Sequence, residues 1–531
     1  MPVAKIDCTS SFSCDKLNNM INELNSTASE VNNDAQIANN SKDIAVDAKN
    51  VAESARDEAV NAKENVEQNA IDIAKNAADI AVKDATEDAN KAKDEAIIAK
   101  NIAENAANTA TIKADEIKSY VIPTEATYSP EAIDQKILGA QYYSIGIPGK
   151  IGFGVGICPE DDLPEYLVPM PGTYTVGHDN YGNYYHPVAD SVFVFIPKHY
   201  YKIIGNAFYC STHKEDKDYV LERAFINSGE EMRGIFVSKY QGSNYNGIFA
   251  SRKSVDPVST HSDHNPVANI NGCDENRYDE LYTACKSLGD DFFLTSIFVY
   301  SMLSRLAKAH AAAGTVATCA FKDISPYLPK GCNNNALKDT NDNSVEYEES
   351  GYSNCGKTGS ATNFAKTSHN GQNCGVVDIN GNMWEVASGF TRDDNDFKIL
   401  KESVDIASLT EDSAYDYSNY ETIDISDLVS DNDGWIRLGN GANQVFEFSA
   451  DRNSTSYKRT SLSIPAASGA SSGGTVYYGN DGVYRYLRSS MACLVGGNWG
   501  YGSLAGAFAL LLLYARGSSN YSVGGRASVF L

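Results

Sequence analysis

The histidines and cysteines, which could bind a metal or act in catalysis, are scattered along the chain and form no known catalytic or metal-binding pattern. His261 and His264 make an HxxH pair in the segment THSDHNP, but neither HExxH nor a cysteine–histidine set accompanies them, which favours solvated loop histidines. The eleven cysteines include no CxxC pair, so reduced, mostly buried thiols are expected. The sequence has no GxSxG, phosphate-binding loop or dinucleotide motif. We therefore predict a protein that is not an enzyme and holds no metal.

Acidic side chains are dense between residues 391 and 432, a polar stretch that predicts an insertion or a set of long loops. Asp431, Asp433 and Gly434 resemble the start of a calcium-binding loop, but such a loop would close on Ala442 instead of a glutamate. Solvated acidic loops are the favoured interpretation. No cofactor is expected, and a structural calcium ion is an alternative that no motif supports.

Two segments combine turn residues with large aromatic side chains. In CGVVDINGNMWEVASGF, residues 374–390, Asn380 and Gly381 mark a turn and Trp384 supplies packing material directly after it. In GGNWGYGSLAGAFAL, small residues are interspersed with Trp499 and Phe508, which allows tight turns and close approach between strands. Taken alone, the first segment predicts a structural turn with a buried tryptophan.

Together these two segments resemble a known family. DINGNMWEV is similar to the motif of the formylglycine-generating-enzyme type of C-type lectin fold. The stretch GGNWGYGSLAGAFAL…AR…VGGR resembles the variable region of retroelement-diversified proteins of the phage major tropism determinant type. The resemblance implies an α+β fold in which a C-type-lectin-like domain carries a variable region at residues 493–526. Oxidases of this fold depend on a pair of cysteines in the carboxyl-terminal part, whereas only Cys493 follows Cys374 here, so that activity is not implied.

The resemblance also implies which positions are replaceable. In this family the unmutated template has asparagine at many sites, because the retroelement machinery randomises adenines. An AAY codon reaches Tyr, Gly, Ser and Leu by changing adenines alone, Gly517 fits a serine codon, and Asn520 would be an unaltered site. The predicted ligand-binding positions are Gly500, Tyr501, Leu504, Leu511, Leu513, Tyr514, Gly517, Ser518, Asn520, Tyr521 and Ser522.

A surface that recognises a receptor should place replaceable side chains on a framework whose packing does not depend on them. In a half-buried strand, Leu510 and Leu512 would face the core and leave Leu511 and Leu513 exposed. The alternative is a strand buried on both faces, with all four leucines inside. The predicted framework consists of Asn380, Gly381, Trp384, Gly497, Trp499, Phe508 and Arg526.

The elements that would carry these residues differ sharply along the chain. No glycine precedes Gly139 and no proline occurs between Pro2 and Pro123, so the first quarter is not an ordinary globular domain. Small and apolar residues recur at steps of three and four with phase shifts, which predicts a coiled-coil stalk over residues 17–119. About one hundred helical residues would form a rod on the order of 150 Å long. Its alanine-rich seam favours a homo-oligomer, with a trimer as first choice, and a solvated single helix or a disordered linker is the alternative.

The remaining segments complete the expected organisation. Residues 1–16 are interpreted as an attachment peptide, 120–190 as a neck or collar, and 191–531 as the C-type-lectin-like domain with inserted loops at 391–432. Strands are predicted at residues 191–204 and 234–242, and helices at residues 277–288 and 296–313.

Charge and composition narrow the partners. A net charge of -25 argues against nucleic acid and anionic membranes, and no apolar run approaches the ~20 residues of a membrane span. The resemblance, together with the predicted stalk, implies a bacteriophage tail or head fibre that is made in the host cytoplasm, joins the virion through its amino terminus, and binds a host-surface protein or glycan. A bacterial surface-displayed variable adhesin is the alternative, but residues 1–16 contain no visible secretion or lipidation signal.

Overall fold

The computed structural model describes residues 142–205, 207–322, 331, 345–347, 355–361, 364–425, 434–437, 447–464 and 482–531. The chain separates into two compact units, residues 1–137 and 138–531, and every described residue belongs to the second unit. The predicted attachment peptide at 1–16 and the predicted stalk at 17–119 lie outside the described residues. The architecture given below is therefore that of the carboxyl-terminal unit alone.

The first six-stranded sheet joins segments from both ends of the described chain and is antiparallel throughout. Buried phenylalanines fill its centre, where the rings of Phe195 and Phe236 lie 4.8 Å apart. Its strand order is β1 (Val168–Pro169), β2 (Asn183–His186), β3 (Ser191–Pro197), β9 (Gly234–Ser238), β22 (Ala527–Phe530) and β12 (Phe293–Leu294).

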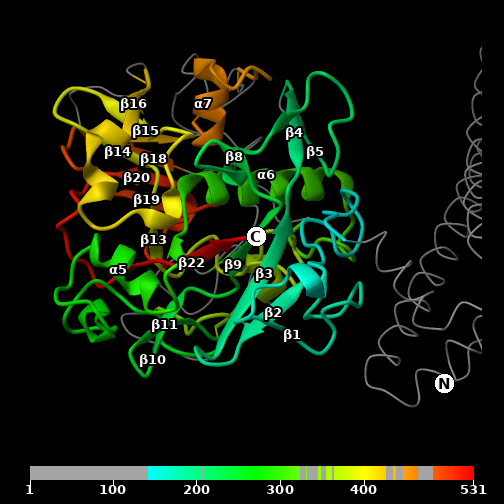
Figure 1. Ribbon diagram of the computed structural model, residues 1–531, viewed down its shortest axis with the longest axis horizontal. Coiled ribbons are helices and arrows are strands. Elements are labelled where there is room, and N and C mark those ends of the chain that lie inside the picture. Colours follow the sequence, from blue (N-terminus) through cyan, green and yellow to red (C-terminus); the bar gives the residue numbers. More distant parts are fainter. Residues whose placement is uncertain are drawn as a thin grey trace, which may run out of the picture. The chain divides into compact units, whose positions relative to one another are not determined.

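The second six-stranded sheet contains most of the carboxyl-terminal strands. Pairing is antiparallel except between β18 and β20 and between β13 and β21, which run parallel. In Figure 1, β18, β20, β19 and β13 lie one below another on the left. The strand order is β17 (Gly434–Arg437), β18 (Gly482–Arg485), β20 (Leu510–Leu512), β19 (Cys493–Val495), β13 (Trp384–Ala387) and β21 (Val523–Gly524).

Smaller sheets surround these two. One three-stranded sheet has the order β14 (Phe390–Arg392), β15 (Phe397–Leu400) and β16 (Tyr420–Thr422). A second has the order β5 (Ala207–Ser211), β4 (Tyr200–Ile204) and β6 (Val220–Leu221). Two hairpins pair β7 (Ile226–Asn227) with β8 (Glu230–Glu231), and β10 (Gly242–Tyr245) with β11 (Ile248–Ser251).

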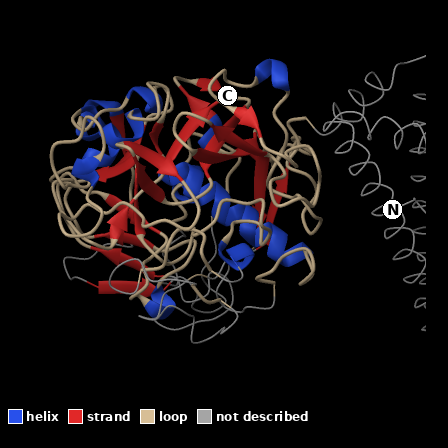
Figure 2. Ribbon diagram, turned by 90° about the horizontal axis from the view of Figure 1, so that it is seen from below, coloured by secondary structure: helices blue, strands red, loops and turns tan. Residues whose placement is uncertain are grey.

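The α6 helix (Ile297–Ala313) crosses the middle of the described unit among the strands, as Figure 2 shows. Ser296 caps it by accepting a hydrogen bond from the backbone N–H of Val299, and it ends at Gly314. Because it is buried on nearly all sides, it serves as a core element rather than a surface helix. The other α-helices of the described residues are α5 (Glu280–Lys286) and α7 (Thr455–Ser461), and none of the three is long and apolar enough to cross a membrane.

Short 3₁₀ helices connect these elements. Several follow an aspartate or proline, as at Asp405, whose side chain accepts a hydrogen bond from the backbone N–H of Ala407. They span Glu160–Asp162, Arg223–Phe225, Val267–Asn269, Phe364–Thr367, Ile406–Ser408, Ser413–Tyr415, Tyr417–Asn419 and Gly502–Leu504.

The predicted regular elements are confirmed, whereas two expected boundaries are wrong. The predicted strand at 191–204 is split into β3 and β4, and α5 and α6 occupy the predicted helical segments. Residues 142–190 do not form a separate neck, because β2 pairs with β3 and this segment contributes to the main core. Residues 391–425 are not loops alone, since β14, β15 and β16 form a sheet with a buried apolar side.

The predicted reduced, buried thiols are confirmed for the cysteines that the structure describes. All eight of them are free and buried. Burial raises the pKa of the Cys285 and Cys493 thiols well above the usual value, so these side chains behave as small apolar groups.

Two buried ion pairs connect the core elements. In the first, Glu222 accepts two hydrogen bonds from Arg305 of α6, one of them from Nε at 2.8 Å. In the second, Arg526 donates to both carboxylate oxygens of Glu385 on β13, each at 2.6 Å. Burial opposes the charge on Arg526, but Glu385 more than offsets this, so the pKa of Arg526 lies above its usual value. Removing either member would leave an uncompensated charge inside the protein.

We predict that Glu385→Gln lowers the free energy of unfolding by about 3 to 5 kcal/mol, because it breaks the buried pair and leaves Arg526 charged in the core. Urea unfolding of the full chain, followed by tryptophan fluorescence, measures this, since all three tryptophans lie in the carboxyl-terminal unit. Glu231→Gln is the control, because the Lys198–Glu231 pair is exposed and should contribute less than about 1 kcal/mol. Equal losses in the two variants would contradict the prediction.

Candidate functional site

The carboxyl-terminal segment forms two loops around strands of the second sheet. One loop joins β19 to β20, and the other joins β20 to β21. Gly496 and Gly497 begin the first loop with positive φ angles of 84° and 83°. A Cβ atom on Gly497 would lie 2.3 Å from the Cβ of Ala505, so no larger residue fits there. These two loops hold nearly all of the predicted ligand-binding positions.

The predicted framework residues are all buried. Trp384 and Trp499 each hold a loop in place, since Trp384 N donates to Ser522 O at 2.9 Å and Trp499 N donates to Asn382 O at 3.0 Å. Arg526 is the buried partner of Glu385 described above. The complete buried set is Asn380, Gly381, Trp384, Gly497, Trp499, Phe508 and Arg526.

Exposure varies among the predicted ligand-binding positions. Gly500, Gly517 and Tyr521 are exposed, and Tyr521 is the most exposed large side chain of the two loops, at 43%. The half-buried positions are Tyr501, Leu504, Leu513, Tyr514, Ser518 and Asn520. We call these nine residues the carboxyl-terminal surface.

Two predicted positions, Leu511 and Ser522, lie inside the protein. Leu511 is 2% exposed because β20 runs between β18 and β19 and all three of its leucines are covered. The expectation that Leu511 faces solvent is therefore wrong, and β20 is a strand buried on both faces. Ser522 is buried because its hydroxyl and backbone N–H both donate to Oδ1 of Asn520.

Tyrosines of the carboxyl-terminal surface pack on framework aromatics. The rings of Tyr501 and Trp384 lie 5.1 Å apart, edge to face, and those of Tyr521 and Trp499 lie 5.9 Å apart. Tyr514 packs edge to face on buried Tyr278 at 6.0 Å. Burial raises the pKa of Tyr501, and the phenol of Tyr514 adds to this effect.

The loop at 259–264 holds the second loop, which joins β20 to β21, through Asn520. Thr260 Oγ1 donates to Asn520 O at 3.0 Å and accepts from Asn520 N at 3.1 Å. We call these two hydrogen bonds, between the Thr260 hydroxyl and the backbone of the second loop, the Thr260 clasp. His264 stacks near Tyr521 with ring centres 5.3 Å apart, and His261 packs on the same ring at 6.2 Å. Both histidines lie in this loop and are half-buried, and the His261 side chain is 33% exposed. Within the described part of the chain, no group of three or more metal-ligating side chains occurs.

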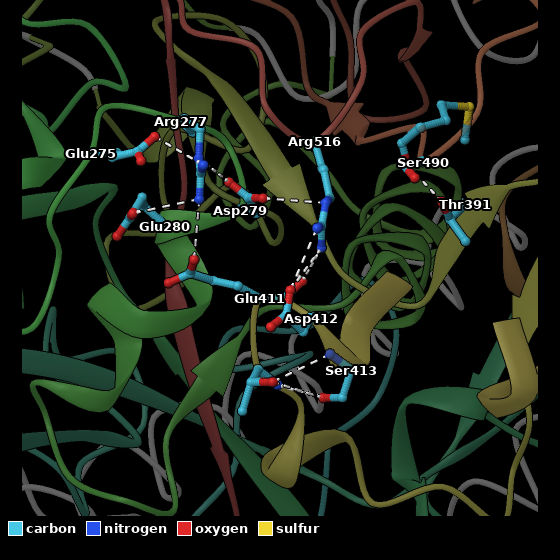
Figure 3. A network of polar contacts seen from close by, with 12 residues as sticks. Glu275, Arg277, Asp279, Glu280, Thr391, Glu411, Asp412, Ser413, Ser490 and Arg516 are labelled. Atoms are coloured by element: carbon cyan, nitrogen blue, oxygen red, sulfur yellow. Dashed lines mark hydrogen bonds and ion pairs between the residues drawn. The ribbon is translucent and has the colours of Figure 1, made fainter. Parts of the chain in front are cut away.

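A network of charged residues fixes the base of the second loop (Figure 3). Asp279 lies between two arginines, 3.1 Å from Nε of Arg277 and 3.6 Å from Nε of Arg516. Arg277 also contacts Glu411 at 3.4 Å, and Arg516 Nη1 donates to the Glu411 carbonyl at 2.8 Å. Burial raises the pKa of Asp279, and the two arginines oppose this rise. No local pattern in the sequence predicts this network, because its residues lie far apart in the chain.

The turn at 378–382 supports the same framework. Asp378, Gly381 and Asn382 have positive φ angles of 56°, 78° and 63°. Asp378 Oδ2 accepts a hydrogen bond from Gly359 N at 2.8 Å, while Oδ1 is buried without a partner among the described residues. Burial raises the pKa of Asp378 to about 6.

No protein-family model matches the chain, and no curated protein matches it. Among solved structures, the U1, M1 and I1 variants of the Major Tropism Determinant are similar, each at 12% sequence identity with a TM-score of 0.26. Each superposition covers 64% of this chain and 63% of the other, so the chain spans less than two thirds of those proteins. A likeness at this TM-score assigns neither a fold nor a function.

We predict that Asp378 lowers the free energy of unfolding as the pH rises from 4 to 6. Its pKa is raised in the folded state, so the unfolded chain releases this proton first as the pH rises, which favours unfolding. A shift of about two units corresponds to about 3 kcal/mol. Asp378→Asn should therefore become more stable relative to the natural protein from pH 4 to pH 7, as measured by urea unfolding.

Asp412→Asn serves as the matched control for this pH dependence. The side chain of Asp412 is 95% exposed and lies 3.5 Å from Arg516, so its replacement should change the free energy of unfolding by less than about 1 kcal/mol. A constant stability difference between Asp378→Asn and the natural protein across this pH range would contradict the prediction.

Proposed function

We propose that the protein is a receptor-binding fibre protein whose carboxyl-terminal unit recognises a ligand on a host cell. One observation carries the proposal: exposed and half-buried residues of the carboxyl-terminal surface pack against a buried aromatic framework that has its own supports. Trp384, Trp499 and Arg526 are held by backbone hydrogen bonds or by the Glu385 ion pair. Side chains on such a surface can be exchanged at limited cost to folding.

The composition of the carboxyl-terminal surface supports recognition of a macromolecule. Tyr501, Tyr514 and Tyr521 offer large contact groups with few rotatable bonds, and Gly517 and Ser518 leave room around them. The Thr260 clasp and the Asp279 network fix the backbone of the second loop before any ligand arrives. Such prior ordering reduces the entropic cost of binding.

The wider proposal follows from the sequence resemblance. In this proposal, the unit has a C-type-lectin-like fold of the formylglycine-generating-enzyme type and carries no catalytic activity. Residues 17–119 form a trimeric coiled coil, residues 1–16 join a virion protein, and three tethered heads bind the host surface with avidity. The variable positions are diversified by a retroelement. The mainly β architecture with three α-helices in the described residues is compatible with this domain type.

We predict that Tyr521→Ala weakens binding of the full chain to host cells by at least about tenfold, because it removes the most exposed aromatic contact of the surface. Flow cytometry of the labelled protein on a panel of bacterial strains measures binding. The melting temperature should change by only a few degrees, because exposed side chains contribute little to stability.

Tyr209→Ala is the matched control, since Tyr209 is also 43% exposed but lies on β5. It should bind every strain as the natural protein does. Equal loss in both variants, unchanged binding of Tyr521→Ala, or a failure of the natural protein to bind any strain of the panel would count against the proposal.

The diversification hypothesis has a separate test in the neighbouring DNA. An adenine-rich near-copy of the sequence that encodes residues 493–526 is expected beside a reverse transcriptase gene. Virion structural genes on either side are expected for a fibre protein, whereas a secretion locus would favour the adhesin. Absence of the near-copy would overturn the diversification hypothesis. The cell-binding assay would still test the proposed binding surface.

A further inference from the structure

A polar cavity outside the carboxyl-terminal surface has the features of a second binding site. Its volume is about 340 Å³, within the range of small-molecule sites. It lies between the 3₁₀ helix Arg223–Phe225, the ends of β15 and β16, and α7. The labels of β15, β16 and α7 stand near one another at the top of Figure 1. No residue that lines it belongs to the carboxyl-terminal surface.

Arg223 supplies a buried positive charge to the wall of this cavity. Its side chain donates to the carbonyl of Ile226 at 2.6 Å and to those of Leu400 and Lys401 at 3.3 and 3.2 Å. Arg223 is only 4% exposed, yet in the described residues no carboxylate forms an ion pair with it. Burial lowers its pKa, as expected for a charge that lacks full compensation.

The other buried arginines show what is unusual about Arg223. Arg305 and Arg526 are paired with Glu222 and Glu385. Arg392, which is 5% exposed, donates to the carbonyls of Asp394 and Asn395 and, like Arg223, has no ion pair among the described residues. Arg392 does not line the cavity, so only Arg223 combines an uncompensated charge with access to it. A bound anion would supply the missing countercharge.

The rim of the cavity adds to its positive character. Glu402 is paired with Arg452, whose Nε lies 3.2 Å from it, and Glu421 is paired with Lys458 at 2.7 Å. Both carboxylates are thus neutralised by their own cations. Arg223 and exposed Lys401 have no ion pair among the described residues, although Lys401 Nζ donates to the Ser418 carbonyl at 2.8 Å. The lining therefore has a surplus of two positive charges in a chain of net charge -25. This surplus favours an anion at the cavity through short-range attraction.

The remaining lining residues suit a sugar more than a bare ion. Ile399, Leu400 and Tyr457 belong to the buried core and form the apolar base of the cavity. Ser403 and Asn453 place side-chain hydrogen-bonding groups on the rim. A ring with hydroxyl groups and one anionic substituent would use all three kinds of contact.

We propose that this cavity binds an anionic saccharide unit, with the anionic group directed to Arg223 and Lys401. The anionic group of the ligand is a carboxylate or a phosphate. Contacts with the sugar ring would make a saccharide bind more tightly than a free inorganic anion. The inference does not depend on the receptor-binding function, because the two sites share no residue. The cavity adds a second ligand site to the head.

Calorimetric titration of the full chain with methyl β-D-glucuronide tests the proposal, in a buffer free of phosphate and carboxylates. One ligand per chain is expected to bind. Methyl β-D-glucoside, which lacks only the carboxylate, should bind at least about tenfold more weakly, and so should inorganic phosphate, which lacks the ring. Equal binding of the glucoside, tighter binding of phosphate, or no binding of the glucuronide would overturn the proposal.

Single substitutions in the lining test whether the glucuronide binds in the cavity. Arg223→Met should abolish glucuronide binding, whereas Arg392→Met removes a similarly buried, unpaired arginine and should leave it unchanged. Lys401→Glu should weaken binding at least about threefold without disturbing the core, because Lys401 is exposed. Lys217→Glu, at an exposed lysine outside the cavity, is its control. If Arg223→Met does not fold, the Lys401 pair decides: equal binding by both lysine variants would refute the assignment.

Discussion

The buried pair of Glu385 and Arg526 is the interaction on which the arrangement of the described unit depends. Glu385 lies on β13 of the second sheet and accepts a further hydrogen bond from Tyr300 of α6 at 2.7 Å. Arg526 directly precedes β22 of the first sheet and also donates to the carbonyls of Ser238 and Asp378. One salt bridge thus joins two sheets, the central helix and the strained turn at 378–382. Charges buried this deeply require full pairing, which fixes the relative position of these four elements.

This arrangement separates the parts of the carboxyl-terminal unit that hold the fold from those that are exposed to solvent. The framework tryptophans are fixed through backbone hydrogen bonds, and the tyrosines of the carboxyl-terminal surface lie against them. The second loop is further held by the Thr260 clasp and by the arginines around Asp279. Variation on this surface is therefore constrained at Leu511 and Ser522, which are buried, and less constrained at Tyr521 and Gly517.

The sequence predicts elements and framework well where the signal is local. Bulky residues directly after the Asn380–Gly381 turn, and glycines around Trp499, are enough to mark a buried framework. The alternation of side chains along a strand wrongly places Leu511 in solvent, because a run of leucines cannot distinguish a half-buried strand from one that is covered on both faces. Contacts between distant segments leave no local trace, which is why the packing of His264 on Tyr521 and the pairing of Asp279 with Arg516 were not predictable. The boundary at 191 failed for a related reason, since glycine-rich and proline-rich turns between 142 and 190 conceal β2, which pairs with β3, and β1, which pairs with β2.

The position of β22 within the first sheet has a consequence for how the protein is made. Residues 527–530 lie between β9 and β12, which are synthesised more than two hundred residues earlier. On the ribosome, the edges of β9 and β12 stay unpaired until residue 530 has emerged, and their closure is a late, long-range step. The segment 493–526 must therefore be threaded into place before the first sheet can be completed. Misfolding within residues 493–526 would therefore leave β9 and β12 without their common partner strand and expose the unit to proteolysis.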